Sequence, residues 1–299
     1  MTMNKYIELV DKKLDEYLKI EYPESIFKSM KYTVTLPGKR LRPVMCMEAC
    51  RVFGGNVEDA LPTACAIEML HAQSLIHDDL PCMDNDNFRR GKPSNHKVFG
   101  EAIAVLAGDA LLSYAPQTII EQSKNLSAET VLKVLHTFVS AAGAYQLIGG
   151  QVADIKSEGA VWENIDGKEM LEGKTKDETL YYIHTNKTAA LFKLALKAGA
   201  IIAGATDEQI AEMETFGQKF GLAFQIYDDI MDVTSTFEEL GKTLGKDAEE
   251  GKLTYVTLYG LDKAKAKAQE LLDDTRKIIS KYNSDIFNGI LDKIESKIK

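Results

Sequence analysis

The stretch "AIEMLHAQSLIHDDLPCMDNDNFRRGKP" (66–93) joins an apolar run of the kind that is normally buried to a block of acid and then a block of base. Apolar residues recur three and four positions apart over 58–80, which predicts a helix that ends at the acidic block. Neighbouring carboxylates repel one another unless positive charge lies between them. The arginines that follow, a metal ion and water are the candidates. The charged residues of the stretch are Asp78, Asp79, Asp84, Asp86, Arg89, Arg90 and Lys92.

The rest of the chain repeats the helical period. Strict alternation with β-branched residues does not occur, so the chain is predicted to be all-α. Ser127 and Thr206 precede two of the helices as candidate N-caps. The breaks between helices are too short to be linkers, which predicts one domain over 1–299. The other expected helices span 3–20, 42–53, 99–123, 127–148, 189–202, 207–231 and 261–281.

A second acidic motif, "FQIYDDIMD" (224–232), lies about 150 residues after the first. On a helix Gln225, Asp228, Asp229 and Asp232 share one face. A solvated acidic face is the alternative, but the flanking residues are aromatic and no lysine or arginine is interleaved. Oxygen ligands without a histidine or cysteine cluster favour Mg²⁺, with Mn²⁺ as a substitute. Two such stripes therefore predict a site where metal carries a diphosphate.

A calcium-binding loop is excluded. The segment "DNDNFRRGKPSN" (84–95) opens like an EF-hand, but Phe88 and Arg89 stand where a ligand and the glycine belong. Asn95 stands where the bidentate glutamate belongs.

Cations gather in the breaks between helices. Arg89 and Arg90 follow the first motif, where arginine forks could grip phosphate oxygens. A single lysine is more often a solvated surface charge, but clustering in glycine-containing breaks favours anion binding. The further candidates are Lys39, Arg40 and Arg42 in "PGKRLRP", Lys187 with Thr188 in "HTNKTAA", and Lys242, Lys246 and Lys252 in "GKTLGKDAEEGK".

Composition narrows the class of protein. The chain has 299 residues, of which 45% are hydrophobic and 27% charged, and its net charge is −9. An acidic chain without a basic run is not expected to bind nucleic acid. No stretch of about 18 uncharged apolar residues is found, so no integral membrane association is expected. Four cysteines without a Cys-x-x-Cys pair, and no apolar leader, indicate free thiols in a cytoplasmic protein.

Together the motifs DDLPCMD with RRG, FQIYDDIMD, PGKRLRP, GGQVAD (149–154) and NKT (186–188) resemble those of the trans-prenyl diphosphate synthases. The resemblance runs in order from about residue 36 to 256. It implies a single bundle of long helices around a deep central cavity, usually in a homodimer. It also implies a head-to-tail condensation of isopentenyl diphosphate with an allylic diphosphate, dimethylallyl or geranyl.

The resemblance assigns roles by motif. It implies that Asp78, Asp84 and Asp228 hold Mg²⁺, with Asp79 and Asp232 assisting. Arg89, Lys187, Lys242 and Lys252 would grip the allylic diphosphate. Lys39, Arg42, His71 and Arg90 would hold isopentenyl diphosphate. The residues expected to flank the reacting carbons are Thr188, Gln225, Gln151 and Asp154.

One departure from the family pattern, two rival functions and one cysteine pair bear on this resemblance. Pro37 stands where the family usually has glycine, which constrains the loop before Lys39. A terpene cyclase would carry a different second motif, and a non-catalytic partner subunit would lose its aspartates. The pair Cys46 and Cys50 resembles a cysteine pair at subunit contacts, or is two small core residues one turn apart.

Product length is expected to depend on the positions four and five before Asp78, which are Ser74 and Gln73. Only the resemblance places Gln73 at the floor of the product cavity. Glutamine is shorter than the tyrosine common in fifteen-carbon synthases, but a buried amide resists a hydrocarbon chain unless its hydrogen bonds are satisfied. Farnesyl diphosphate is the expected main product, with geranylgeranyl diphosphate as the alternative.

Overall fold

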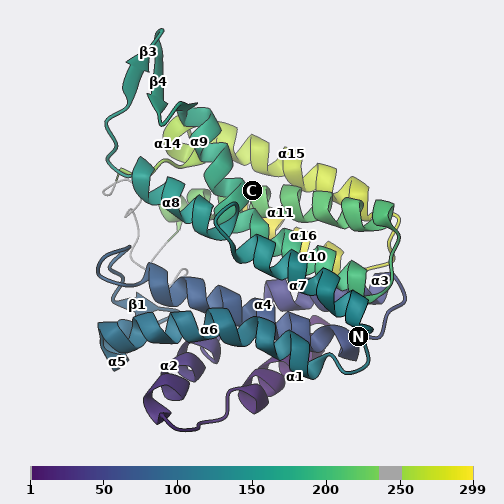
Figure 1. Ribbon diagram of the computed structural model, residues 1–299. Coiled ribbons are helices and arrows are strands. Elements are labelled where there is room, and N and C mark those ends of the chain that lie inside the picture. Colours follow the sequence, from purple (N-terminus) through teal and green to yellow (C-terminus); the bar gives the residue numbers. More distant parts are fainter. Residues whose placement is uncertain (1, 236–250, 299) are drawn as a thin grey trace. The chain divides into compact units, whose positions relative to one another are not determined.

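The structure is a computed structural model that describes residues 2–235 and 251–298 (Figure 1). The chain divides into two compact units. Unit 1 comprises Met1–Val139 and Leu194–Ala211, and unit 2 comprises Ser140–Lys193 and Glu212–Lys299. The one-domain interpretation stays a prediction.

Unit 1 is built around two long antiparallel helices. The helices α4 (Val57–Asp78) and α6 (Glu101–Gln122) pack along each other (Figure 1). Ile67, Met69 and Leu70 are fully buried on α4, and Leu111 and Ile119 on α6. Each such side chain stabilises the fold by about 1.5–3 kcal/mol. The other elements are α1 (Met3–Tyr17), α2 (Glu24–Val34), α3 (Leu41–Val52), β1 (Phe88–Arg89), β2 (Lys92–Pro93), α5 (Asn95–Phe99) and α7 (Ala128–Ala142).

Unit 2 has an aromatic core. Phe192 meets Phe220 edge-on with ring centroids 4.9 Å apart, and Phe216 meets Phe287 at 5.0 Å, the geometry that aromatic quadrupoles favour. Its elements are α8 (Leu147–Ser157), β3 (Glu163–Ile165), β4 (Lys168–Leu171), β5 (Lys174–Thr175), α9 (Lys176–Ile183), the π-helical turn η1 (His184–Thr188), α14 (Tyr255–Tyr259), α15 (Leu261–Ile279) and α16 (Asp285–Ile298). The helices α7, α10 (Ala189–Ile202) and α11 (Asp207–Thr234) begin in one unit and continue into the other.

The predicted helix starts are confirmed where capping chemistry was read. Ser127 Oγ accepts from Thr130 N at 3.1 Å before α7, and Thr206 Oγ1 accepts from Gln209 N at 3.4 Å before α11. The predicted helix over 127–148 is wrong in extent, because α7 ends at Ala142 and α8 begins at Leu147. Gly143 follows α7 directly, and glycine costs about 1 kcal/mol in a helix interior.

Five short strands were not predicted. They form a two-stranded and a three-stranded antiparallel sheet. In the β3–β4 hairpin Asp166 and Gly167 have φ of 52° and 77° between the paired residues Ile165 and Lys168. Positive φ at both central residues marks the I′ turn, for which Asp-Gly is a strong signal. The prediction missed these hairpins because two to four residues are too few to show alternation.

The prediction that nothing could span a membrane is not supported by hydropathy alone. By length and composition, Glu101–Gln122 and Ala128–Ser157 could each cross a bilayer. The buried share of their most apolar windows is 39% and 28%. Since core helices of soluble proteins pass the same test, this is weak evidence.

Candidate active site

The first motif lies where α4 ends in unit 1. Asp78 is the last helical residue, and the chain turns at Leu80 because Pro81 disfavours helix at the residue before it. The turn folds back so that Asp84 N donates to Asp78 O at 2.9 Å. Asp78 and Asp84, both half-buried, are thereby brought together.

Asp79 is held by an arginine. Its side chain is buried, and Oδ1 accepts from Arg89 Nε at 2.9 Å and also from Arg89 Nη2. Arg89 Nη2 lies 3.2 Å from Asp86 Oδ2 as well. Burial raises the pKa of Asp79 to about 6, against the effect of the Arg89 charge. As arranged, Asp79 anchors Arg89 beside the motif.

The residues predicted for isopentenyl diphosphate lie on the loop before α3, at the start of α3, on α4 and on the β1–β2 turn. Lys39 is exposed, whereas Arg42, His71 and Arg90 are half-buried. Arg90 Nη1 donates to Leu36 O at 3.2 Å. Burial and the neighbouring charges of Arg42 and Arg90 hold the pKa of His71 well below its ordinary value. His71 is therefore neutral beside a cationic cluster.

Arg40 does not join that cluster as an anion ligand, contrary to the prediction. It is 4% exposed, and it donates from Nη1 to Glu68 Oε1 at 2.7 Å and from Nε to Asp11 Oδ1 at 2.8 Å. Glu68 is 3% exposed. The sequence analysis missed this buried pair, although a single acid inside the apolar run "AIEML" was a usable signal, since buried acids are usually paired.

Gln73 is buried, and its NH₂ group has a hydrogen-bond partner. Gln73 Nε2 lies 3.1 Å from His77 Nδ1, and His77 Nε2 lies 3.1 Å from Val105 O on α6. An amide donor at Nδ1 and a carbonyl at Nε2 fit the tautomer that carries its proton on Nε2. Ser74 Oγ donates to His71 O at 2.9 Å, within α4.

In unit 2 two glycines let backbones approach closely. A Cβ added at Gly150 on α8 would lie 2.3 Å from Lys187 N, and one at Gly221 on α11 would lie 2.4 Å from Ala189 Cα. These contacts bring α8 against η1, and α11 against the first residue of α10. Lys187 Nζ donates to Asp154 Oδ2 as a result.

The turn η1 is π-helical, and such turns are frequent at functional sites. It presents Thr188 to α11, where the Thr188 hydroxyl donates to Gln225 Oε1 at 2.5 Å. Gln225 Nε2 in turn donates to Asp229 Oδ1 at 3.0 Å. Thr188, Gln225 and Asp229 thus form one chain of hydrogen bonds.

Both outer aspartates of the second motif lie on α11, as predicted. Asp228 is half-buried and Asp232 is 4% exposed. Gln151 is half-buried on α8. Lys252 Nζ lies 3.6 Å from Glu158 Oε1. The predicted Lys242 and Lys246 lie outside the described residues.

A three-residue metal cage of His, Cys, Asp or Glu is not found within 2–235 and 251–298. Mg²⁺ usually binds proteins through one or two carboxylates together with substrate phosphates. The half-buried Asp78 and Asp84 in unit 1, and Asp228 with Asp232 in unit 2, offer the hard oxygen donors that such binding needs.

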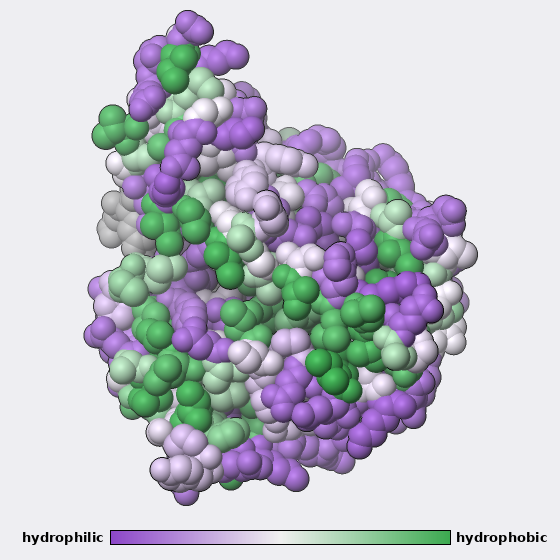
Figure 2. All heavy atoms as spheres, in the orientation of Figure 1, coloured by the Kyte–Doolittle hydropathy of each residue, from purple (hydrophilic) through white to green (hydrophobic). Residues whose placement is uncertain are grey.

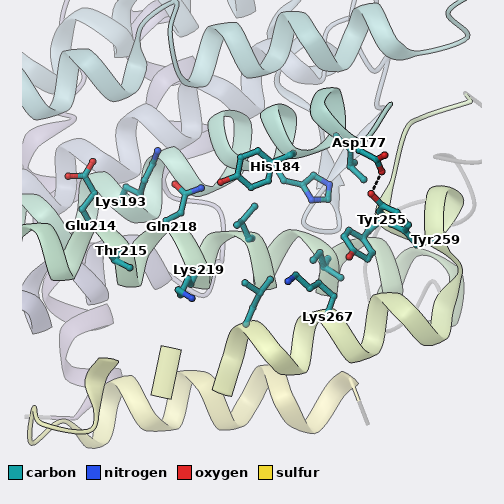
Figure 3. Close-up of a pocket in the computed structure, with 15 residues that line it drawn as sticks. Asp177, His184, Lys193, Glu214, Thr215, Gln218, Lys219, Tyr255, Tyr259 and Lys267 are labelled. Carbon is teal, nitrogen blue, oxygen red and sulfur yellow. Dashed lines mark hydrogen bonds between the residues drawn. The ribbon is translucent and has the colours of Figure 1, made fainter. Parts of the chain in front are cut away.

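A cavity of about 700 Å³ lies in unit 2, and the predicted site residues are not among the residues that line it (Figure 3). His184, Tyr255 and Tyr259 line one end, where the Tyr259 hydroxyl donates to Asp177. Burial lowers the pKa of His184 to about 4, so this imidazole is neutral. His184 Nε2 lies 3.5 Å from Asp229 Oδ2, so the cavity ends beside the second motif.

The thiols are free, as predicted for the described chain. Cys46, Cys50 and Cys65 are buried, and Cys82 is exposed. Cys46 and Cys50 lie on α3 of unit 1, and both are fully buried. This agrees with two core residues one helical turn apart.

Comparison with known proteins tests the resemblance read from the motifs. A family model described as polyprenyl synthetase matches residues 23–288. A dimethylallyltranstransferase of Fischerella ambigua is 46% identical over 92% of this chain and 76% of that protein. A chloroplastic geranylgeranyl pyrophosphate synthase of Catharanthus roseus is 44% identical over 92% of this chain and 74% of that protein.

A solved structure supports the same family and the same fold. An FPP/GFPP synthase from Zymomonas mobilis, in its apo form, superposes with a TM-score of 0.81 at 32% identity, over 98% of this chain and 97% of that one. The predicted all-α fold and the predicted family are therefore confirmed. The chain belongs to the polyprenyl synthetase family and is a prenyltransferase.

Proposed function

We propose that this chain condenses isopentenyl diphosphate head to tail with allylic diphosphates, and that geranylgeranyl diphosphate is its main product. The main support for this reaction is the family match over residues 23–288, together with the presence of both aspartate motifs. Intact motifs disfavour a non-catalytic partner subunit, and Asp232 in the second motif disfavours a terpene cyclase. Incubating the purified protein with both substrates and measuring pyrophosphate release tests the reaction.

The side chains around the motifs support this reaction. Asp78 and Asp84 would hold the metal in unit 1, and Asp228 with Asp232 in unit 2. Bound Mg²⁺, or Mn²⁺ in its place, would supply positive charge that stabilises the departing diphosphate. Arg89 would add a fixed guanidinium beside it. Activity that survives exhaustive chelation would contradict the metal dependence.

The substrate-side residues of unit 2 have a matching chemistry. The Thr188 hydroxyl proton points to Gln225, which leaves the oxygen lone pairs available to a developing carbocation. Lys187, the residue before Thr188, donates a hydrogen bond to Asp154 and would bind the diphosphate. Such preorganised dipoles stabilise charge where it develops.

Geranylgeranyl diphosphate replaces farnesyl diphosphate as the favoured product. The relative from Catharanthus roseus, 44% identical, is named for the twenty-carbon product. Farnesyl diphosphate is the second candidate, supported by the name of the Zymomonas mobilis structure. Chromatography of the dephosphorylated products against fifteen- and twenty-carbon alcohols decides between them.

We propose a homodimer whose subunits meet at an exposed apolar surface of unit 1. Val105, Leu106 and Ile120 on α6, with Leu132 and Val139 on α7, are 41–66% exposed. Figure 2 shows hydrophobic side chains gathered at the surface over these helices. Exposed apolar surface of this kind often meets a partner, and a second copy is the commonest one. An active monomer in sedimentation at micromolar concentration would contradict it.

We also propose a cytoplasmic location, in keeping with the free thiols. Cell fractionation, with the protein followed in soluble and membrane fractions, tests it. Recovery in the membrane fraction would point instead to the two apolar stretches Glu101–Gln122 and Ala128–Ser157.

A further inference from the structure

We infer that Asp229 is a positioning residue that holds Gln225 and the start of α14 in place, rather than a metal ligand. The inference rests on the proposed function, because it assigns Gln225 and Thr188 to the substrate. It separates the two adjacent aspartates of the second motif into different roles.

Both carboxylate oxygens of Asp229 are already used within unit 2. Oδ1 accepts from Gln225 Nε2 at 3.0 Å, and Oδ2 accepts from Tyr255 N at 2.8 Å. His184 Nε2 packs 3.5 Å from Oδ2. Asp229 is 3% exposed, whereas its neighbour Asp228 is half-buried. The burial and the donors describe an anchor for protein groups.

The contact with Gln225 determines which end of its amide faces the substrate side. A carboxylate accepts only from the NH₂ end, so Oε1 must point away from Asp229. There it accepts from the Thr188 hydroxyl at 2.5 Å. If the amide turned over, its NH₂ would meet the hydroxyl and the Thr188 proton would turn outward. Asp229 therefore orients Thr188 through Gln225.

The contact with Tyr255 fixes a second part of the site. Tyr255 is the first residue of α14, and its backbone N–H is separate from the capping box that Thr254 and Thr257 form. Lys252 lies three residues before it. Asp229 thus ties the chain that carries Lys252 to α11. Figure 3 shows Tyr255 and His184 at the same end of the cavity.

The first experiment compares Asp229→Asn with Asp228→Asn in the full-length protein. Asp229→Asn is expected to lower kcat by about 100-fold, the effect of a small misplacement of reacting groups. The Mg²⁺ concentration for half-maximal activity should stay unchanged, while Asp228→Asn should raise it several-fold. If Asp229→Asn raises the Mg²⁺ requirement as Asp228→Asn does, Asp229 is a ligand and the inference is overturned.

The second experiment removes only the N–H of Tyr255. Proline is well tolerated at the first position of a helix, and Thr254, at φ −117° and ψ 165°, already has the conformation that precedes proline. Tyr255→Pro is expected to lower kcat by about 10-fold, since a hydrogen bond to a charged group is lost. Tyr255→Ala, which keeps the N–H, is the matched control. Equal activity of the two variants would contradict the role of this N–H.

The third experiment tests whether Asp229 acts through Gln225. Gln225→Met removes the amide at similar length, and combining it with Asp229→Asn should cost little beyond the larger single effect. Fully multiplicative losses would overturn the positioning role. A wild-type protein without prenyltransferase activity would instead refute the proposed function. If Asp229→Asn does not fold, the Tyr255 and Gln225 variants still decide the inference.

Discussion

The two acidic motifs carry the same aspartate pair, but the second aspartate of each pair has different partners. In unit 1 Asp79 accepts from the charged guanidinium of Arg89. In unit 2 Asp229 accepts from the Gln225 amide and the Tyr255 backbone N–H. Among these contacts of the described residues, the first motif is therefore held by an ion pair, and the second by neutral donors.

The first aspartate of each pair is less buried than the second. Asp78 and Asp228 are half-buried, whereas Asp79 and Asp229 are 1% and 3% exposed. Successive residues of a helix point about 100° apart, so one member of the pair can face the protein while the other faces the site. Each Asp-Asp pair thus combines a buried anchor and a half-buried carboxylate.

The largest expected effect is on the half-buried carboxylates, Asp78 and Asp228. Asp78→Ala and Asp228→Ala should each lower turnover by about 100- to 1000-fold with the helical signal retained, because they act on charge stabilisation and not on packing. Steady-state kinetics and circular dichroism measure both. Asp273→Ala, at an exposed position on α15, is the control. Near-full turnover of Asp228→Ala would break the two-motif interpretation.

The ion pair of the first motif should dominate stability. Arg89→Ala leaves Asp79 buried without its charged partner and is expected to lower the free energy of unfolding by about 3–5 kcal/mol. Denaturant unfolding measures it. The double variant Asp79→Asn, Arg89→Met removes both charges and should be more stable than Arg89→Ala. If the double variant is the less stable one, the pair is not what makes the single loss costly.

The surroundings of the second motif should be sensitive to acid. His184 has a folded-state pKa of about 4 against about 6.5 when unfolded, so the unfolded chain binds the proton first. Its contribution to stability is complete above pH 6.5 and is lost as pH falls toward 4, by on the order of 3 kcal/mol. His184→Gln should flatten the stability profile in this window. Parallel profiles of variant and wild type would refute the shifted pKa.

The smallest expected effect concerns the helices that precede the motifs. Five residues before the first aspartate, α4 carries Gln73 and α11 carries the smaller Ala223. Gln73→Tyr should shift the product distribution toward shorter chains and Gln73→Ala toward longer ones, with turnover little changed. Product chromatography measures both. A distribution that neither substitution moves would show that Gln73 is not the floor.

Much of the fold was accessible to sequence analysis because helices leave a local signal. The boundaries of α10 match the predicted 189–202, and those of α4 and α6 lie within two residues of the prediction. The helices α2, α5, α9, α14 and α16 were missed, and the prediction covered only the first two residues of α8. The hairpins escaped as well, although Asp166-Gly167 carries a turn signal that could have located one of them.

The sequence by itself determined the all-α fold, the two aspartate motifs and the family, because periodicity, residue chemistry and motif order are local properties of the chain. Only the tertiary structure decided how the neighbouring charges are used. In the folded protein Arg40 donates to Glu68 and Arg89 donates to Asp79. Asp229 accepts from Gln225 and Tyr255. These partners lie 4 to 28 positions apart in the sequence. The Gln225–Asp229 pair is four positions apart on one helix face, which the sequence shows. No local pattern specifies the longer pairings, because burial and backbone approach select them only after the helices pack.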